Sequence, residues 1–386
     1  MNTLQTRFIE PLDVLILRGN KLFGDPGSYG EALLPPWPSV AAGAIRSRML
    51  ADDRIDMQAF ARGQISHATL GTPAAPGSFA LAGFHLARRM ADGRHELLIA
   101  PPADLSIVED EHATATARLS RPVPLASGIG SANPLPMHPV LAETTRAKPA
   151  SGYWLTQSGF EAYLHGKPPA SEHLVKSNAL WRIDERVGVG LSVAQRRADE
   201  GKLFSLQAIA FKPGVGFMVS VTGAEPPKNG LLRLGGDGRG AAIHAIEHRP
   251  PAADYAALRQ ARSCRLLLTT PGLFRQGWLP NGAQPENRRE DGAIRFELHG
   301  VAGWIVAAAV PRAEVISGWD LAARDGKGQP KPAQRVAPTG SVYWLDDLEA
   351  TPDALEKLAS QGLWSDTCED AARRAEGFNH FTFAVY

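Results

Sequence analysis

The chain has 386 residues, of which 44% are hydrophobic and 21% charged, a composition typical of a folded protein with two domains or one large one. Its formal net charge of +1 excludes a uniformly basic nucleic-acid binder, so any surface for nucleic acid must be a local patch. Two cysteines cannot form a zinc site or a disulfide framework by themselves, and no apolar run reaches the ~20 residues of a membrane span, so a cytoplasmic protein without membrane contact is expected.

The N-terminal part of the chain predicts a strand and then a helix. Residues 6–18 carry the apolar content of a first strand, and a loop rich in glycine and proline follows over residues 19–36. The helix comes next, with Ser39 as its predicted N-cap. Arg46 and Arg48 are two residues apart, about 200° around this helix, and therefore lie on either side of its apolar stripe.

A region rich in proline follows this helix. Residues 79–88 and 96–100 predict a hairpin, and prolines then recur through residues 101–149. Proline fixes its own backbone and lacks an amide donor, so this segment is expected to be neither a regular helix nor a central strand. It is also long for a loop, which indicates either a functional or a disordered segment. A short helix is predicted at residues 154–165.

The middle of the chain contains the clearest hairpin pattern and a glycine-rich loop. Apolar residues alternate over 204–210 and again over 217–221, which predicts that these two strands pair. The loop Gly235-Gly236-Asp237-Gly238-Arg239-Gly240 lacks the ending of a P-loop and the glycine spacing of a dinucleotide fingerprint. Its amides can bind an anion, with Arg239 adding a charge, or the loop can be a plain turn.

The C-terminal third repeats this order of elements. A helix is predicted over residues 352–360, with Thr351 as its N-cap. The predicted strands around it are 265–270, 304–310, 341–345 and 380–386. The repeated order predicts a doubled β-α-β-β-α-β plan, with a boundary near residue 250 where Arg249-Pro250-Pro251 breaks the chain.

Motifs of catalysis and metal binding are not found in the sequence. It has no His-Glu-x-x-His, Cys-x-x-Cys or Gly-x-Ser-x-Gly. His244 and His248 fall on a predicted strand, about 13 Å apart and too far for one metal ion. Asp346-Asp347 is interpreted as a solvated turn at the end of a strand. No enzyme activity, metal or cofactor is therefore expected.

Candidate contacts for nucleic acid are arginines, loop glycines and one aromatic side chain. The charged residues between 256 and 277 are all arginines, Arg265 among them, whereas Arg186 and Arg196 stand beside acids that nearly cancel their charge. Trp37 can stack on a base, or it can pack the start of the helix. The candidate RNA-binding residues are Gly235, Gly236, Gly238, Arg239, Gly240, Arg46, Arg48, Trp37, Arg186 and Arg196.

Five blocks of sequence together resemble the RAMP superfamily of CRISPR-Cas proteins, most closely the third subunit of the type III-B Cmr effector complex. In chain order they are PPWPS running into GAIRS (35–39 and 43–47), ERVGVGL with EGKLF (185–191 and 200–204), LGGDGRGA (234–241), PTGSVYW (338–344) and AEGFN (375–379). Each block is short, but the order of the five is specific, and they span nearly the whole chain. The region 70–150 matches no block.

The resemblance implies an α+β fold of two ferredoxin-like (RRM-like) β-α-β-β-α-β domains. The first spans residues 1–250, with a long proline-rich insertion at about 52–200 and the glycine-rich loop 235–240, and the second spans 251–386. It implies a non-catalytic subunit that binds the 5′ handle of a CRISPR RNA and bridges the large polymerase-like signalling subunit to the backbone RAMP filament in antiviral defence. Part of 101–149 is then expected to be irregular and to project towards a neighbouring subunit or an RNA duplex.

Two other functions stay open at this point. Some RAMP proteins cleave RNA with histidine and lysine or tyrosine beside the glycine loop, so His244 and Tyr255 leave room for an endoribonuclease that processes CRISPR RNA. The chain is alternatively a scaffold that binds proteins only, with the glycine loop as a plain turn. An RNA binder differs from a scaffold in having an RNA affinity that falls with salt.

Overall fold

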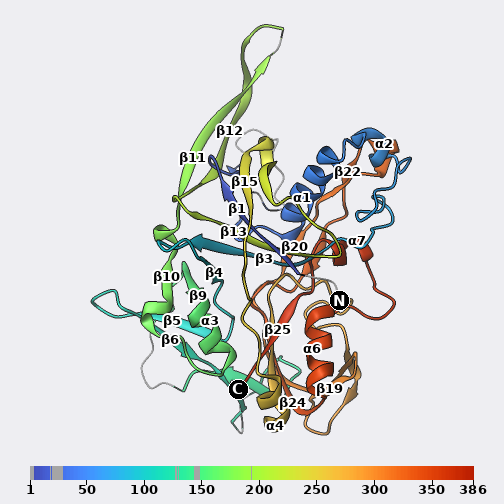
Figure 1. Cartoon of the computed structure of the whole chain (residues 1–386). Coiled ribbons are helices and arrows are strands. Elements are labelled where there is room, and N and C mark those ends of the chain that lie inside the picture. The colour runs from blue at the N-terminus through green and yellow to red at the C-terminus, as the bar shows by residue number, and fades with distance from the viewer. Residues whose placement is uncertain are drawn as a thin grey trace. The chain divides into compact units, whose positions relative to one another are not determined.

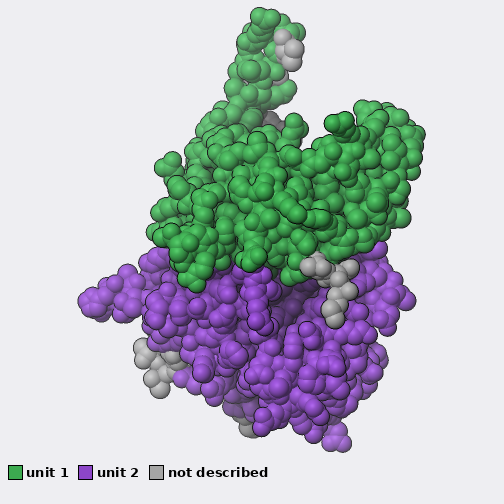
Figure 2. Space-filling view, viewed as in Figure 1, with its two compact units in different colours: residues 1–95, 177–247, 315–334 green, residues 96–176, 248–314, 335–386 purple. Residues whose placement is uncertain are grey.

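The computed structural model describes residues 4–17, 19, 29–126, 128, 130–142, 148–192 and 194–386. They fall into two compact units, each made of several stretches of chain (Figure 2). Unit 1 comprises residues 1–95, 177–247 and 315–334, and unit 2 comprises 96–176, 248–314 and 335–386. The change of unit after residue 247 lies near the predicted boundary at 250. The sequence did not indicate that 96–176 belongs to the second unit or that 315–334 belongs to the first.

The main sheet of unit 1 is antiparallel. Its strands lie in the order β3-β13-β1-β15-β14, and their bounds are β1 Gln5–Pro11, β3 Ala80–Arg89, β13 Val215–Thr222, β14 Asn229–Arg233 and β15 Gly240–Ala245. Phe8, Phe217 and Ile243 are fully buried in this sheet. β1 is shorter than predicted because Asp13 accepts a hydrogen bond from the Val14 amide at 2.7 Å and turns the chain.

Helix α1 (Pro38–Asp52) lies against this sheet, and the short α2 (Met57–Ala61) follows it (Figure 1). Ala41, Ala44, Ile45 and Met49 are buried on α1, as their helical spacing predicted. The predicted N-cap is wrong by two residues: Trp37 occupies the cap position, without a side-chain hydrogen bond. The helix begins with Pro38 because the first helical residue needs no amide donor and proline already has a helical φ.

A long two-stranded ribbon is formed by β11 (Trp181–Ser192) and β12 (Arg197–Phe211), with the short β2 (Tyr29–Gly30) added in parallel (Figure 1). The hairpin predicted for 202–222 is therefore wrong in its partners: β12 pairs with β11, and β13 pairs with β1 and β3. The reason lies in burial. β13 is buried at six of its eight positions and so needs a neighbour on each side, whereas most of β12 is partly exposed.

Unit 2 contains a second antiparallel sheet, in the order β17-β18-β19-β24-β16-β25. The bounds are β16 Ser263–Leu268, β17 Ala283–Arg288, β18 Ile294–Leu298, β19 Val301–Ala309, β24 Val342–Glu349 and β25 Phe381–Ala384. α4 (Tyr255–Ala261) and α6 (Pro352–Gln361) contribute Leu258, Leu355 and Leu358 to its core. The predicted N-cap of α6 is confirmed, because Thr351 accepts a hydrogen bond from the Ala354 amide at 3.2 Å.

Each unit has one of the two helices that the β-α-β-β-α-β plan requires. The strand orders β3-β13-β1-β15 and β19-β24-β16-β25 correspond to each other. Between β13 and β15 every residue is described, and the chain forms strand β14 in place of a helix. In unit 2 the stretch between β16 and β19 is also fully described and forms β17 and β18. The predicted α+β class is confirmed, and the structure has mostly antiparallel sheets with few helices.

The proline-rich segment 101–149 is more regular than expected. It contains two hairpins, β5 (Leu105–Glu109) with β6 (Ala115–Leu119), and β7 (Arg121–Pro124) with β8 (Met137–Val140). Ile107 and Ala117 of the first hairpin are buried. Two-stranded pairing explains this, because a strand with a free edge tolerates a missing amide donor. Residues 143–147 lie outside the described part of the chain.

The rest of residues 96–176 surrounds helix α3 (Gln157–Leu164), which is shorter than predicted because 153–156 form a strand. β10 (Leu174–Lys176), β9 (Tyr153–Thr156) and β4 (His95–Ile99) are neighbours in that order.

The remaining short elements are β20 (Glu314–Ile316), β21 (Trp319–Asp320), α5 (Ala323–Gly326), β22 (Gln329–Pro330), β23 (Gln334–Val336) and α7 (Ala371–Ala375).

A buried ion pair ties residues 96–176 to the second sheet. Arg265 on β16 pairs with Asp104 at 2.8 Å, and the two side chains are only 2% and 0% exposed. The hydroxyl of Tyr163 donates to Asp104, and Arg265 donates to the backbone carbonyls of Tyr163 and Val385. Arg265, which the sequence placed in an exposed arginine run, is therefore an internal structural residue.

Candidate nucleic-acid interface

Unit 1 contains a cavity of about 1080 Å³ beside helix α1 and the glycine-rich loop. Segments that are far apart in the sequence meet around it. Its walls are Ile16, Leu17, Leu33, Pro36, Trp37, Ser39, Val40, Gly43, Ala44, Ser47, Arg48, Ala51, Met57, Leu231, Leu232, Arg233, Gly235, Gly236, Gly238 and Gly240. The volume is that of a site for a small organic group, and most of the walls are apolar.

The glycine-rich loop is the turn between β14 and β15. The Leu234 amide donates to the Arg239 carbonyl at 2.8 Å, and the Gly236 amide donates to the Ile16 carbonyl at 2.8 Å. Gly235 has a φ of 74°, and a Cβ there would lie 2.8 Å from the Ile16 oxygen. A side chain is therefore excluded at this position by both the backbone conformation and the close approach of residue 16.

Arg239 lies in the same loop but does not line the cavity. Its Nη1 forms an ion pair with Asp13 Oδ2 at 2.8 Å. The hydrogen bond from the Val14 amide lowers the pKa of Asp13, and Arg239 and Arg186 lower it further. The charge that the sequence assigned to a phosphate contact is therefore matched, at least in part, by an acid 226 residues away in the chain.

Trp37 and Arg48 both line the cavity, and both reach it from α1 or its cap. Arg48 Nη1 donates to the Leu231 carbonyl at 2.6 Å, and its Nη2 pairs with Asp52 at 2.8 Å. These contacts hold α1 beside β14. Trp37 Nε1 and Arg48 Nε are buried and have no hydrogen-bond partner among the described residues.

The other predicted arginines lie elsewhere in unit 1. Arg46 packs over the ring of Phe79 at 4.9 Å, on the side of α1 away from the cavity walls. Arg186 pairs with Asp184 at 2.9 Å on the ribbon, and Arg196 occupies the turn of the ribbon with a φ of 51°. The structure thus gathers Trp37, Arg48 and four loop glycines at one cavity, and it places Arg46, Arg186, Arg196 and Arg239 outside its walls.

Sequence reasoning missed several residues of the walls. Arg233 and Met57 line the cavity and belong to no recognisable motif, whereas Ser47, which also lines it, is the last residue of the block 43–47. Gly43 had a usable signal, since a glycine in the interior of a helix is unfavourable and often marks a close approach. Apart from Ser39, the remaining wall residues are apolar, and apolar residues in a sequence do not reveal whether they face a core or a cavity.

The described residues contain no cluster of three or more histidine, cysteine, aspartate or glutamate side chains that could hold a metal ion. His244 lies on β15 opposite Phe8 and Asn229, and His248 follows the end of that strand. Among the described helices, none combines the length and the apolar character that crossing a membrane requires.

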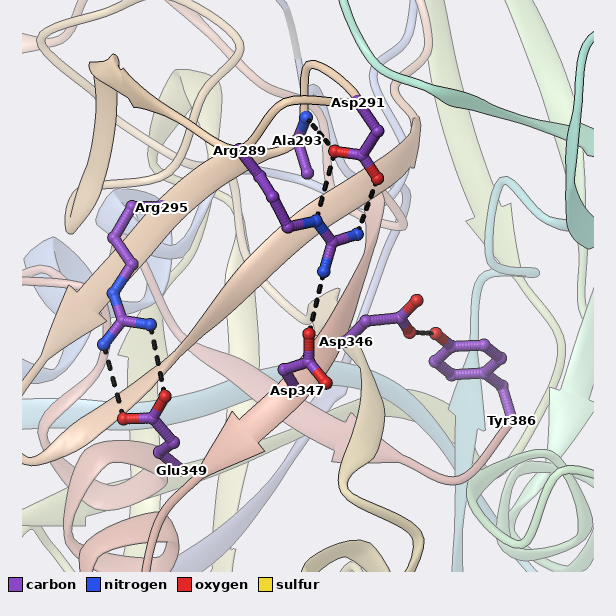
Figure 3. A network of polar contacts seen from close by, with 8 residues as sticks. All are labelled: Arg289, Asp291, Ala293, Arg295, Asp346, Asp347, Glu349 and Tyr386. Carbon is purple, nitrogen blue, oxygen red and sulfur yellow. Dashed lines mark hydrogen bonds and ion pairs between the residues drawn. The ribbon is translucent and has the colours of Figure 1, made fainter.

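The acid pair Asp346-Asp347 lies within β24, and not in the solvated turn that the sequence indicated. Figure 3 shows that Arg289 binds Asp347 and that Asp346 accepts a hydrogen bond from the Tyr386 hydroxyl. The distance from Arg289 Nη1 to Asp347 Oδ2 is 2.8 Å. Asp347 has a φ of 51°, where the pairing of β19 and β24 is irregular. Both carboxylates therefore have protein partners.

Fold and site together define an α+β protein with antiparallel sheets and a glycine-rich hairpin that closes a cavity beside its first helix. The chain belongs to the Cas_Cmr3 family of CRISPR-associated proteins, whose model matches residues 7–384. This match confirms the resemblance to Cmr proteins seen in the sequence. No match was found among curated protein sequences.

Two solved structures are similar to this chain over most of its length. One is a chain of the cryo-EM structure of the type III-B Cmr-beta complex bound to cognate target RNA and AMPPnP, with 13% identity, a TM-score of 0.47 and coverage of 97% of this chain and 95% of that one. The other is from the Cmr-beta complex bound to cognate target RNA, with 13% identity, a TM-score of 0.43 and coverage of 88% and 86%.

Proposed function

We propose that this chain is a non-catalytic, RNA-binding subunit of a type III-B Cmr effector complex, and that it binds the 5′ handle of the CRISPR RNA. Membership of the Cas_Cmr3 family supports a place in such a complex. The corresponding strand orders of the two units support two ferredoxin-like domains, each of which has lost one helix.

One observation carries the RNA-binding part of the proposal. Trp37, Arg48 and the loop glycines were chosen from the sequence as RNA contacts, and they meet at a single cavity. Single-stranded RNA is bound in this way, because its unstacked bases enter apolar sites while arginines and backbone amides contact the phosphates. A chain with a net charge of +1 can therefore bind RNA through a local group of arginines at this cavity.

Contacts with the large signalling subunit and the backbone subunit are the second part of the proposal. The ribbon β11–β12 supports it, since Val187, Leu191 and Leu203 are 73%, 65% and 59% exposed. The strand register places Val187 and Leu203 on one face, because Leu203 lies opposite Val189, and Leu191 follows just beyond an irregularity in the pairing. A two-stranded ribbon cannot bury such a face by itself, and exposed apolar patches of this kind mark interaction surfaces.

RNA binding is tested by Arg48→Gln in the complex reconstituted with handle RNA. We expect an affinity loss of about tenfold and a shallower dependence of the affinity on salt, because one charged contact with phosphate is removed. Arg94→Gln is the matched control, because Arg94 is exposed on a turn outside the cavity walls and its side chain pairs with the neighbouring Asp92 at 2.7 Å. Equal affinities of both variants and the unmodified protein, with unchanged melting temperatures, would contradict the proposal.

A further inference from the structure

Unit 2 contains a second cavity, of about 450 Å³, which the proposed RNA site does not include. Every residue of its walls belongs to unit 2. Most of the walls are apolar, and three wall residues, Trp278, Ala308 and Val310, also pack against the hydrophobic core of this unit. The packing of the core therefore holds the apolar part of the cavity in place.

Trp278 is fixed by its backbone and is still accessible. The hydroxyl of Tyr343 on β24 donates to the Trp278 carbonyl, and the preceding Gly277 closes a turn by donating its amide to the Phe274 carbonyl at 3.3 Å. The tryptophan itself is only half-buried. A partly exposed tryptophan in the wall of a preformed cavity is typical of the anchor positions of protein interfaces.

Three arginines belong to this cavity or adjoin its walls. Arg335 lines it, Arg312 lies between two wall residues in the chain, and Arg275 is two residues from a third. All three are exposed, and none forms a hydrogen bond or ion pair with another described residue. No wall residue is acidic, and the adjoining acid, Glu314, is half-buried and already has an interaction within the protein. The surroundings of the cavity therefore carry a local excess of positive charge.

The chemistry of the walls restricts what occupies them. Besides the indole of Trp278, the polar side chains on the walls are those of Asn133 and Arg335, and the Asn133 Oδ1 atom already accepts the Leu135 amide at 3.1 Å. A nucleotide base fits poorly, because the donors and acceptors on its edge would face apolar walls. A proline or an aliphatic side chain has no such edge. Carboxylates beside it in a peptide suit the arginines.

We propose that this cavity binds an acidic segment of another protein subunit of the effector complex. One apolar side chain of the segment lies against Trp278, and carboxylates on either side of it pair with Arg275, Arg312 and Arg335. Charge complementarity selects the segment, and the apolar anchor supplies the contact area. This inference rests on the place of the chain in an effector complex, and not on the RNA-binding part of the proposed function.

Site-specific photocrosslinking in the complex tests the inference. Ala313 lines the cavity and is exposed, so the photoreactive residue benzoylphenylalanine can replace it without entering the core. The complex is reconstituted from purified subunits and irradiated, and the crosslinked peptides are sequenced by mass spectrometry. We expect crosslinks to a segment of another subunit in which aspartate and glutamate outnumber lysine and arginine. The same photoreactive residue at Ala261, an exposed alanine of α4 outside the walls, should not crosslink to that segment.

Charge reversal tests the ionic part of the contact. Arg335→Glu should reduce the crosslink yield from position 313 about tenfold, because it replaces an attraction with a repulsion. Arg259→Glu is the matched control: Arg259 is an exposed arginine of α4 that does not line the cavity, and its replacement should leave the yield unchanged. Both arginines are exposed, so the melting temperatures of the two variants should equal that of the unmodified protein.

Several outcomes would overturn the inference. Crosslinks from position 313 to RNA, to a basic segment or only to this chain itself would show a different occupant, and an assembled complex without any crosslink would show that the cavity is not an interface. A yield that Arg335→Glu leaves unchanged would remove the ionic contact. If the expected crosslinks form but Arg48→Gln does not change RNA affinity, the RNA-binding proposal is wrong and this inference stands. A chain that does not join the other subunits would contradict both.

Discussion

A single arginine can have opposite roles, and only its surroundings distinguish them. Arg265 belongs to a run of arginines that the sequence analysis considered as a surface for nucleic acid. In the structure it is buried against Asp104 and two backbone carbonyls. The sequence predicted that Arg239 contacts a phosphate, but in the structure it pairs with Asp13. Arg48 is anchored by Asp52 and Leu231 and still lines the cavity. In each case a partner distant in sequence or a neighbouring helical turn decides the role.

The buried pair is expected to be important for stability. Asp104→Leu should lower the free energy of unfolding by about 3–5 kcal/mol, because it leaves a guanidinium buried without a counter-charge. Combining it with Arg265→Met removes both charges and should recover much of that loss. Urea-induced unfolding followed by circular dichroism measures both effects. Equal losses in the single and the double variant would show that packing, and not charge, stabilises this contact.

Arg289 and Asp291 are expected to contribute to the free energy of unfolding in a way that depends on pH. The hydrogen bond from Arg289 lowers the pKa of Asp291 in the folded protein (Figure 3). A lowered pKa stabilises the fold above the unfolded-state value of about 3.9, and this stabilisation is lost as the pH falls through the folded-state value. Asp291→Asn should therefore lower stability at about pH 7 and have little effect at about pH 2. The change should stay below about 1 kcal/mol, since Asp291 is 41% exposed.

At the scale of the elements, α1 and the β14–β15 hairpin use glycine for different reasons. Gly43 lies in a regular helix and faces open space. Gly235 has a φ of 74° and packs against the Ile16 carbonyl. Replacing glycine with alanine should therefore change the free energy of unfolding in opposite directions at the two positions.

Gly43→Ala should raise the free energy of unfolding by about 0.5–1 kcal/mol, because alanine is the better helix former and meets no clash. Gly235→Ala should lower it by about 1–3 kcal/mol, because the residue is held in a left-handed conformation and its Cβ would collide with residue 16. Thermal and urea-induced unfolding of both variants checks the signs. Destabilisation by Gly43→Ala would mean that the space beside the helix is already filled.

At the scale of the whole molecule, neither unit is a continuous piece of chain. Unit 2 includes residues 96–176 from the N-terminal half of the sequence. This segment contains Asp104, which pairs with Arg265, and Tyr163, whose hydroxyl donates to Asp104. Unit 1 takes 315–334 from the C-terminal half, where Gly326 approaches the side chain of Arg62. A cut near residue 250 therefore separates parts of the same unit.

Separate expression of residues 1–250 and 251–386 is expected to give two fragments that do not unfold cooperatively. The C-terminal fragment would retain Arg265 without Asp104, which leaves a buried charge unpaired. Calorimetry of each fragment, and of the two together, checks this expectation. A single sharp transition for 251–386 alone would support the continuous domains that the sequence predicted.

The sequence by itself determined the features that depend on neighbouring residues. The N-cap of α6 at Thr351, the apolar stripe of α1 and the alternation in β12 and β13 follow from contacts within a few residues, and the pattern of blocks identified the family. Trp37, Arg48 and the loop glycines, which were selected from the sequence by residue type, line one cavity.

Only the tertiary structure decided which strands pair, where each unit ends and which side chains share a site. The alternation of β12 is compatible with any neighbouring strand, and burial on both faces of β13 selected β1 and β3. The partners of Arg265 and Arg239 are 161 and 226 residues away along the chain. The cavity exists because α1, β14 and residues 16–17 meet in space. Such long-range contacts depend on the packing of the whole chain, which local spacing does not encode.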